Sequence, residues 1–380
     1  MFQYKHPNFA KLVQEYCSLV MVSEQGTPTA FGIHLNSWNS YFFLQRLQIV
    51  SKSNFGNTAK MMEIVNSILY PFKIPFLASS QIYWLYLLST ILLATILYIV
   101  GLANRGKEKS FLEYLLPKEV YLHPSSIALY KYFFLISLFQ IFFVVPTTLF
   151  LAKVADITCQ GLIQITGITT PFAVTSPQLW QQIVFSIFVA LLGDFANFFY
   201  HYLAHKIPLL WEFHKVHHSA EVITPLTVYR IHPFEMFLGT ITIVTITNFG
   251  AGIWIFLFGN GMKELLIYGV SFEIFIFYLA GYNLRHSHIW LAYPQWISHI
   301  FISPAQHQIH HSVDPKHYDK NFGYIFAFWD WMFGCLYVPS NYEKLSFGLS
   351  NGESNLFNSV TNMFLQPLRA IRQRISKNSV

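Results

Sequence analysis

Five long apolar stretches constrain the fold of this chain more than any other feature. Each is long enough for a helix to cross the roughly 30 Å hydrocarbon core of a bilayer, which takes about 20 residues. One such stretch could be a buried helix of a soluble protein, but only 11% of the residues are charged, against about 25% in soluble domains. The sequence therefore predicts an all-α integral membrane protein with four or five transmembrane helices. The stretches are residues 82–102, 127–152, 180–200, 236–259 and 264–284.

The loops between these stretches predict the topology. Lys and Arg gather after the first, third and fifth stretches, whereas the opposite loops contain only Lys153 and Lys263. Cytoplasmic flanks of membrane helices are enriched in basic residues, so we expect the segments after the third and fifth stretches to form a helical cap on the cytoplasmic side. The last two stretches are separated by only NGMK, which predicts a tight hairpin turning at Asn260 and Gly261. The side of residues 1–80 stays open, because their six basic residues do not fit this alternation.

Charge and cysteine content exclude two classes of partner and site. The formal net charge is +6, but no run of Lys and Arg is interleaved with aromatic residues, so nucleic acid is not an expected partner. The three cysteines, Cys17, Cys159 and Cys335, are odd in number and far apart. This spacing argues against a disulfide framework and against a zinc site built from thiolates.

Histidines are crowded into one part of the chain, since 13 of the 16 lie between His201 and His317. The first cluster, HYLAH, continues the third apolar stretch and places His201 and His205 one helical turn apart. Asp194 and Asn197 precede His201 by seven and four residues and share its helix face. An ionisable residue near the end of a membrane helix is costly, so this face is a candidate functional site.

Two further clusters repeat the spacing His-x-x-His-His, which places three imidazoles on one side of a helix. Imidazoles this close repel one another when protonated, whereas neutral imidazoles are good metal ligands. Eight of them are too many for one four-coordinate zinc site, so the pattern predicts two metal ions; the residues alone fit iron, copper or zinc. The two clusters contain His214, His217 and His218, and His307, His310 and His311, and the motif LRHSH adds His286 and His288.

The ordered set of motifs resembles the fatty acid hydroxylase and sterol desaturase superfamily of integral membrane non-haem di-iron enzymes. The resemblance covers residues 115–345, through LLPKEVYLHPSS, the His201 box, LWEFHKVHHS, YRIHPFE, RHSHI, SPAQHQIHHS and DKNFGYIFAFWDWMFG. It implies that one iron is held by His201, His205, His214, His217 and His307, and the other by His218, His286, His310 and His311.

Other residues near the boxes have candidate supporting roles. His288 stands where many members of the superfamily have asparagine, so it either takes over a polar role or enters the metal shell beside His286, which we favour as the ligand. His232 is a reserve ligand. Asp194 is expected either to orient His201 through a hydrogen bond or to cap the helix end.

Two charged groups outside the boxes have simpler interpretations. Arg230 and Glu235 could form an ion pair at the membrane interface. Asp330 lies between two tryptophans, which favours a buried acceptor that holds the C-terminal part of the cap.

The expected reaction is O₂-dependent hydroxylation of a C–H bond in a membrane lipid such as a sterol, a fatty acyl lipid or an alkylglycerol lipid, with desaturation as the runner-up. The cofactors would be two iron ions. The sequence contains no GxGxxG fingerprint for a nicotinamide or flavin domain, so electrons are expected from a separate donor protein or reductant. A non-catalytic membrane protein that binds or senses zinc is the alternative.

The organisation along the chain is predicted in three parts. Residues 1–80 form an N-terminal region of unknown role, and residues 81–345 form the membrane-embedded domain with the histidine boxes. Residues 346–380 form a basic C-terminal tail.

Overall fold

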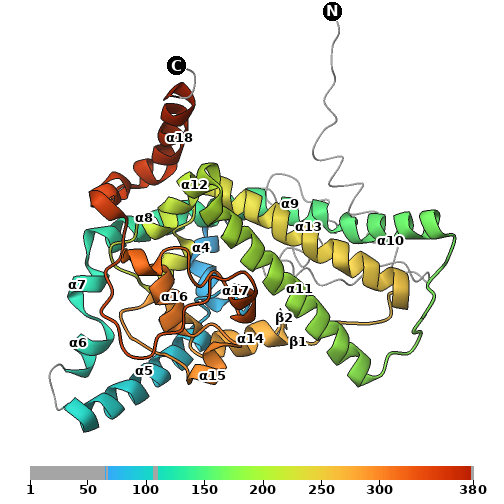
Figure 1. Cartoon of the computed structure of the whole chain (residues 1–380), viewed down its shortest axis with the longest axis horizontal. Helices are drawn as coiled ribbons and strands as arrows, with labels where there is room; N and C mark the ends of the chain where they lie inside the picture. Colours follow the sequence, from blue (N-terminus) through green and yellow to red (C-terminus); the bar gives the residue numbers. More distant parts are fainter. Residues whose placement is uncertain (1–64, 66, 106–109, 378–380) are drawn as a thin grey trace, which may run out of the picture.

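The computed structural model describes residues 65, 67–105 and 110–377, and this part of the chain is almost entirely helical (Figure 1). It contains four helical stretches that are long and apolar enough to cross a membrane, which confirms the predicted fold class. The predictions for residues 1–64 lie outside the described residues. The four stretches are α5 (Trp84–Arg105), the run from Pro124 to Thr166, α11 (Leu179–Lys206) and α13 (Pro233–Phe258).

The second stretch is longer than predicted and is interrupted. It consists of α8 (Pro124–Phe139), the π-helical turn η3 (Gln140–Val144), α9 (Val145–Leu151) and α10 (Lys153–Thr166). Its 43 residues would span about 65 Å at 1.5 Å per residue, about twice the hydrocarbon core, so only part of it can cross a membrane. The π-helical turn directly precedes Pro146, whose ring and missing N–H disturb the regular hydrogen bonds of a helix.

Small residues let α13 pack closely between α10 and α11. A Cβ atom added to Gly250 would lie 2.1 Å from the Leu192 side chain of α11, and one added to Gly252 would lie 2.5 Å from the Ala155 carbonyl of α10. Both additions would clash. Close approach of backbones through small residues is the usual way in which membrane helices pack, and here it aligns α13 along α11.

The prediction of a fifth membrane helix at residues 264–284 is wrong. Helix α13 has its C-cap at Gly259. The hairpin turn lies at Tyr268 and Gly269 and not at Asn260 and Gly261. It joins the strands β1 (Leu266–Ile267) and β2 (Val270–Ser271). The following helix, α14 (Phe272–Leu279), has only eight residues. Its apolar side chains pack against α5 in the protein core, because an apolar run by itself does not distinguish protein core from lipid contact.

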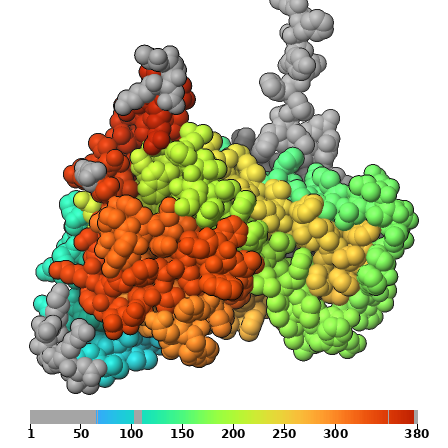
Figure 2. Space-filling view, in the orientation of Figure 1, coloured from blue at the N-terminus to red at the C-terminus, as the bar shows by residue number. Residues whose placement is uncertain are grey.

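A cap of short elements covers one end of the long helices. In the space-filling view its orange and red residues form a continuous surface, and α18 (Val360–Lys377) stands out from it (Figure 2). The elements of the cap are α12 (Pro208–His218), η4 (Pro225–Tyr229), η5 (Tyr282–His286), α15 (Gln295–Ser298), α16 (Pro304–His310), η6 (Pro315–His317), α17 (Phe328–Met332) and η7 (Ser350–Phe357). The remaining short helices, α4 (Tyr70–Lys73), η2 (Ile74–Phe76), α6 (Phe111–Leu115) and α7 (Lys118–Tyr121), flank α5 and α8.

Candidate metal centre

The structure brings nine predicted ligand histidines together from four elements. Helix α11 supplies two of them at its last turns, α12 supplies three, η5 supplies one, and α16 with the residue that ends it supplies three. Each helical pair or triplet shares one helix face because its members are three or four residues apart. The nine are His201, His205, His214, His217, His218, His286, His307, His310 and His311.

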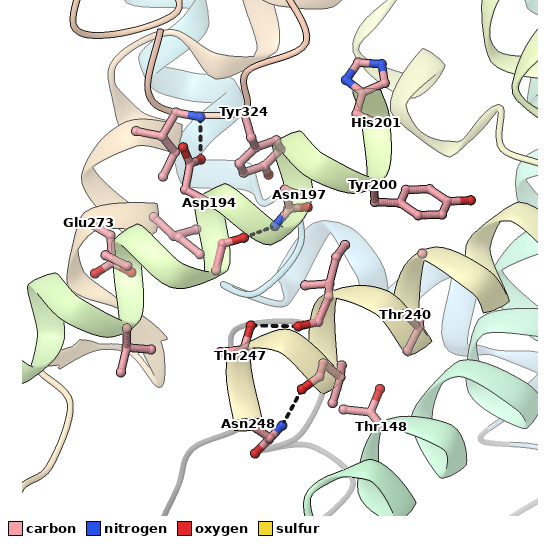
Figure 3. Close-up of a pocket in the computed structure, with 18 of the residues that line it drawn as sticks. Thr148, Asp194, Asn197, Tyr200, His201, Thr240, Thr247, Asn248, Glu273 and Tyr324 are labelled. Atoms are coloured by element: carbon pink, nitrogen blue, oxygen red, sulfur yellow. Dashed lines mark hydrogen bonds between the residues drawn. The ribbon is translucent and has the colours of Figure 1, made fainter. Parts of the chain in front are cut away.

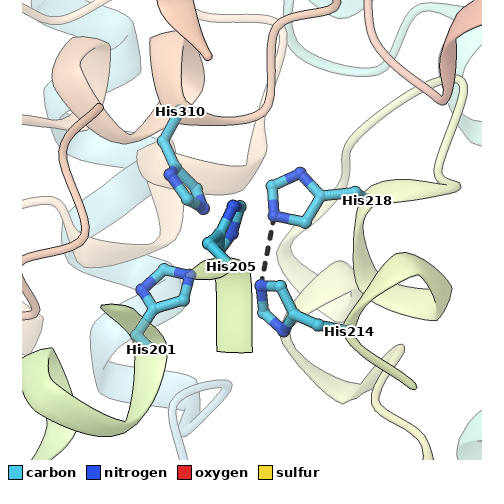
Figure 4. A group of neighbouring side chains, drawn as sticks. All are labelled: His201, His205, His214, His218 and His310. Carbon is cyan, nitrogen blue, oxygen red and sulfur yellow. Dashed lines mark hydrogen bonds between the residues drawn. The ribbon is translucent and has the colours of Figure 1, made fainter. Parts of the chain in front are cut away.

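Distances divide these histidines into two groups. Within each group the candidate ligand atoms, one per residue, lie within 4.8 Å of one another. Group A contains His201, His205, His214, His218 and His310, which converge in Figure 4, and group B contains His217, His286, His307 and His311. This division differs from the one that the resemblance implies, since His217 and His307 lie in group B and His218 and His310 lie in group A. Spacing along the chain does not determine which helix faces which partner.

In group A, ring nitrogens point at one another without ordinary partners. The Nε2 atoms of His201, His205 and His310 are buried and have no hydrogen-bond partner in the described part of the chain. The Nε2 atoms of His214 and His218 are 3.2 Å apart. Buried polar atoms without a partner are costly, and five imidazoles turned toward one point are a donor set that fits a bound transition-metal ion.

In three of the five group A rings the opposite nitrogen is held by a fixed acceptor. The Nδ1 atom of His201 lies 2.9 Å from the carbonyl oxygen of Phe322, and that of His310 lies 2.8 Å from the carbonyl oxygen of Lys320. The Nδ1 atom of His214 lies 2.5 Å from Oε1 of Glu235. Such acceptors place the proton on Nδ1 and leave the Nε2 lone pair available, which is the usual arrangement of metal-binding histidines.

In group B, three Nε2 atoms form a triangle. The distances are 3.0 Å between His286 and His307, 3.1 Å between His286 and His311, and 3.2 Å between His307 and His311. A ring nitrogen either carries one proton or accepts one, so the three cannot all hydrogen-bond to one another. Separations of about 3 Å are expected for nitrogens that lie about 2.1 Å from one ion at right angles, so these side chains also fit a metal.

Group B faces a buried cation. The Arg285 guanidinium lies 3.1 Å from Nδ1 of His307 and donates to the carbonyl oxygens of Tyr324 at 2.7 Å and Gly323 at 3.1 Å. Because a guanidinium can only donate, Nδ1 of His307 is an acceptor and its proton is on Nε2. In this tautomer the Nε2 atom of His307 carries the proton and cannot bind a metal ion. The Nε2 atoms of His201 and His310 carry no proton and can.

Burial keeps the histidines of groups A and B neutral. It lowers the pKa of His214 and His217 to about 3, and in His217 the neighbouring His214 adds to the effect. The pKa values of His218, His286, His307, His310 and His311 are lowered well below the ordinary value, first by burial and then by their ionisable neighbours. Neutral imidazoles are the form that binds metals.

The two additional histidine candidates lie outside both groups. The Nδ1 atom of His232 accepts from the N–H of Phe234 at 3.1 Å and caps α13, and its Nε2 atom lies 3.1 Å from the Phe364 carbonyl oxygen. The Nε2 atom of His288 lies 2.6 Å from the carbonyl oxygen of Tyr114. These contacts make His232 a helix cap and His288 a link between the cap and α6.

Asp194 does not orient His201. Its carboxylate accepts from the N–H groups of Ile325 at 2.7 Å and Phe326 at 3.1 Å and from Nε1 of Trp329 at 3.0 Å, so it fixes the cap to α11. The Nδ2 atom of Asn197 donates to the Gly193 carbonyl oxygen of its own helix at 2.8 Å.

Asp330 holds the cap together, as expected. It is fully buried and accepts from the N–H groups of Phe322 at 2.7 Å and Gly323 at 2.8 Å. These bonds also place the Phe322 carbonyl that His201 contacts.

The expected ion pair between Arg230 and Glu235 is not formed. Arg230 is fully buried and donates to Val216, Ser219, Ser125 and Phe357, which joins α12 to α8 and to the C-terminal segment. Glu235 instead contacts His214. The sequence offered no signal for this contact beyond a carboxyl group in the first turn of a membrane helix.

A cavity of about 290 Å³ leads from the histidines into the bundle of long helices (Figure 3). Its wall includes His201 and His214 of group A and His217, His286 and His307 of group B. From there it follows α11 back to Phe185 and α13 as far as Gly259. Most of the surface that lines it is apolar, so the cavity can hold a lipid chain with one end at the histidines.

Comparisons with known proteins agree with the resemblance seen in the sequence. Residues 186–335 match the family described as fatty acid hydroxylase. Alkylglycerol monooxygenase of Danio rerio is 28% identical over 170 residues, which cover 43% of this chain and 32% of that protein. Cholesterol 25-hydroxylase of Homo sapiens is 28% identical over 167 residues, 43% of this chain and 56% of that protein. Ornithine lipid hydroxylase OlsE of Rhizobium tropici is 24% identical over 178 residues, 46% of this chain and 48% of that protein.

The chain thus spans between about a third and about half of the length of these curated relatives. No solved structure matches.

Proposed function

Because residues 186–335 match the family described as fatty acid hydroxylase, we propose that the protein is a membrane-bound oxidoreductase that uses O₂ to hydroxylate a C–H bond of a lipid. Desaturation is the second outcome of the same hydrogen abstraction. We further propose that the nine histidines of groups A and B hold two iron ions. Bound there, the ions would supply the redox chemistry that activates O₂, which the amino-acid side chains cannot supply themselves.

The cavity is the observation that carries this proposal. It connects apolar surfaces of α11 and α13 with the edge of both histidine groups. A lipid chain can therefore lie between the long helices with one carbon at the histidines, while its surroundings exclude water. A structural zinc site needs no such access.

The protein's own residues position the site. The carbonyl groups of Phe322 and Lys320 and the Glu235 carboxylate hold the protons of His201, His310 and His214 on Nδ1. The second carboxylate oxygen of Glu235, Oε2, is buried and has no hydrogen-bond partner among the described residues, and Glu235 also lines the cavity. Oε2 is therefore the atom best placed to hold a proton beside the substrate.

The donor of electrons and the side of the membrane are also proposals. We infer that electrons come from a separate protein or reductant and that the histidine cap faces the cytoplasm, as the distribution of Lys and Arg predicts. The relatives named above act on an alkylglycerol, cholesterol and an ornithine lipid, so sterols, fatty acyl lipids and ether lipids are all substrates to test.

The test is lipid mass spectrometry of cells expressing the protein under ¹⁸O₂. A lipid that gains labelled oxygen with the wild type but not with His310→Ala supports hydroxylation, and a lipid that loses two hydrogens without label supports desaturation. His299→Ala is the matched control, because His299 is exposed and lies outside both groups. An unchanged lipidome with folded, iron-loaded protein overturns the proposal, and redox-inactive zinc as the bound metal favours the zinc-binding alternative.

A further inference from the structure

The cavity is long compared with its volume. Its lining positions on α13 recur every three or four residues from Glu235 to Gly259, so one face of the helix borders it throughout. Those 24 residue steps correspond to about 36 Å at 1.5 Å per residue. A cavity of about 290 Å³ with this extent favours an elongated molecule that lies along α13.

Polar side chains interrupt the apolar wall where it runs along α9 and α13. Thr148 of α9 and Thr240, Thr247 and Asn248 of α13 line the cavity within the membrane-spanning segments (Figure 3). Polar residues at such depth are expensive and usually functional. Asn248 lies 13 residues beyond Glu235, or about 20 Å along the helix axis.

The three threonine hydroxyls and one of the two Asn248 N–H donors already make hydrogen bonds. The hydroxyl groups of Thr148, Thr240 and Thr247 donate to backbone carbonyls four residues earlier at 2.9, 2.8 and 2.7 Å, and Nδ2 of Asn248 donates to Val244 at 2.9 Å. What remains for a ligand is their acceptor oxygens and the second N–H of Asn248. The Oδ1 atom of Asn248 is buried without a hydrogen-bond partner in the described chain, and the residue is only 4% exposed. A wall of this kind suits a group that donates a hydrogen bond.

From these observations we propose that Asn248 is the centre of a second binding subsite, which accepts a hydrogen bond from an uncharged hydroxyl or amide N–H group of the lipid substrate. The inference rests on the proposed function for the site at the histidines. It assigns the substrate class as an elongated lipid whose polar group binds at Asn248 while a distant carbon reaches the histidines. With carbon–carbon bonds of about 1.5 Å in a zigzag, about 20 Å corresponds to roughly 15 carbons between the two.

The subsite sets a fixed distance between the polar group and the oxidised carbon, and we call this distance the ruler. The polar group is fixed at Asn248, so the oxidised carbon is determined by its distance from that group and not by its distance from the end of the chain. A sterol hydroxyl and a long-chain alcohol present the same hydrogen-bond donor, so either lipid could supply it.

Binding measurements test the subsite without relying on oxidation. The full-length protein in phosphatidylcholine nanodiscs is titrated with radiolabelled 1-octadecanol and octadecyl methyl ether, and with cholesterol and its methyl ether. We expect at least one alcohol to bind about tenfold more tightly than its ether, as one hydrogen bond allows. The alcohol that shows this preference identifies whether a long-chain alcohol or a sterol supplies the hydrogen-bond donor. Equal binding of alcohol and ether in both pairs overturns the proposal, even if every variant fails to fold.

Two variants locate the preference. Asn248→Leu removes the acceptor and is expected to reduce the preference for the alcohol to about onefold. Thr242→Val is the matched control, because Thr242 makes the same type of helix hydrogen bond on α13 but does not line the cavity. A preference that survives in Asn248→Leu, or that is lost equally in Thr242→Val, contradicts the subsite.

Product analysis tests the ruler. With alcohols of 16, 18 and 20 carbons as probes, at about the length that the ruler requires, the oxidised position should stay constant when counted from the hydroxyl. A position that is constant when counted from the methyl end overturns the ruler. If no product forms while the alcohol preference and its loss in Asn248→Leu are observed, the proposed oxidation fails and the subsite stands.

Discussion

The two histidine groups are close neighbours, but they are held in different ways. Three of the five group A rings have Nδ1 fixed by a carbonyl or carboxylate acceptor. In group B, three Nε2 atoms face one another and the Nδ1 atom of His307 faces the Arg285 guanidinium. Group A is therefore preorganised for metal before any ion arrives, whereas His307 must change its tautomer before its Nε2 atom can bind. This difference predicts that the groups bind their ions independently and with unequal strength.

The largest effect is expected from removing one candidate ligand from each group. His205→Ala should lose the ion of group A and His286→Ala the ion of group B, each lowering the metal content from about two ions per chain to about one. Lipid oxidation should fall to background in both. Metal analysis of purified protein measures this, with His299→Ala as the control. If either variant loses both ions, the groups form one cooperative unit and the comparison fails.

Acid should destabilise the metal-free protein through both groups. The folded-state pKa values of His214 and His217 are lowered by burial to about 3, against about 6.5 in an unfolded chain. The unfolded chain therefore binds more protons below pH 6.5, so the free energy of unfolding falls as the pH drops from 6.5 toward 3, by up to about 1.4 kcal/mol per pH unit for each histidine.

Thermal unfolding of metal-free protein between about pH 7 and 4.5 measures this slope. His214→Gln in group A and His217→Gln in group B should each make it shallower. If the stability of the wild type did not change with pH, the burial of both groups would be contradicted. If the two variants changed the slope unequally, the smaller change would mark the group that water reaches.

The Glu235 contact should matter for group A alone. Glu235→Gln removes the carboxylate charge that faces Nδ1 of His214, and loss of such a partner typically weakens metal binding or activity by about 10–100-fold. Competition with a chelator, followed by metal analysis, measures the affinity. An equal loss of both ions would show that Glu235 supports the whole centre and not one group.

A smaller effect is expected from comparing two members of group B. His311→Ala should weaken the group B ion more than His307→Ala, by about tenfold, because His307 must first give up its contact with Arg285, which costs about one hydrogen bond. The same chelator competition tests this. Equal losses of metal affinity in the two variants would show that breaking the contact between His307 and Arg285 does not weaken metal binding.

The smallest effect is expected outside both groups. His232→Ala removes the cap of α13 and should lower the free energy of unfolding by about 0.5–2 kcal/mol, without changing the metal content. Thermal unfolding and metal analysis of the same sample check both statements. Loss of metal in this variant would mean that His232 does serve as a reserve ligand.

Much of the fold could be predicted because its determinants are local. Apolar length identified the four membrane helices, helical spacing identified eight histidines of the two groups, and the LRHSH motif with the family resemblance added His286. The fifth stretch was misassigned because residues 264–284 are as apolar as a membrane helix, whereas they fold into a hairpin and a short helix that pack against α5. Hydropathy measures how strongly a segment avoids water and does not tell which apolar partner it finds.

The parts that could not be predicted depend on contacts between distant segments. The partner of His214 is Glu235, 21 residues later, and the partners of Asp194 lie more than 130 residues away. The partners of His201 and His310 are backbone carbonyl oxygens, which every residue has. No residue type marks such an acceptor in a sequence, so its role becomes visible only in the folded chain.

The order in which the histidines are synthesised sets when the centre can form. Group A contains four histidines that precede residue 219 and a fifth at His310, and group B contains His217 and three histidines that follow residue 285. A ribosome that has completed α11 and α12 has therefore made four of the five group A members but only one of the four in group B. Group A is complete only when His310 has been added and group B only when His311 has been added, by which time all four membrane helices have left the ribosome's active site. Metal loading of either group would thus follow the synthesis of all four long helices, and a chain that terminates before α16 would have both groups incomplete.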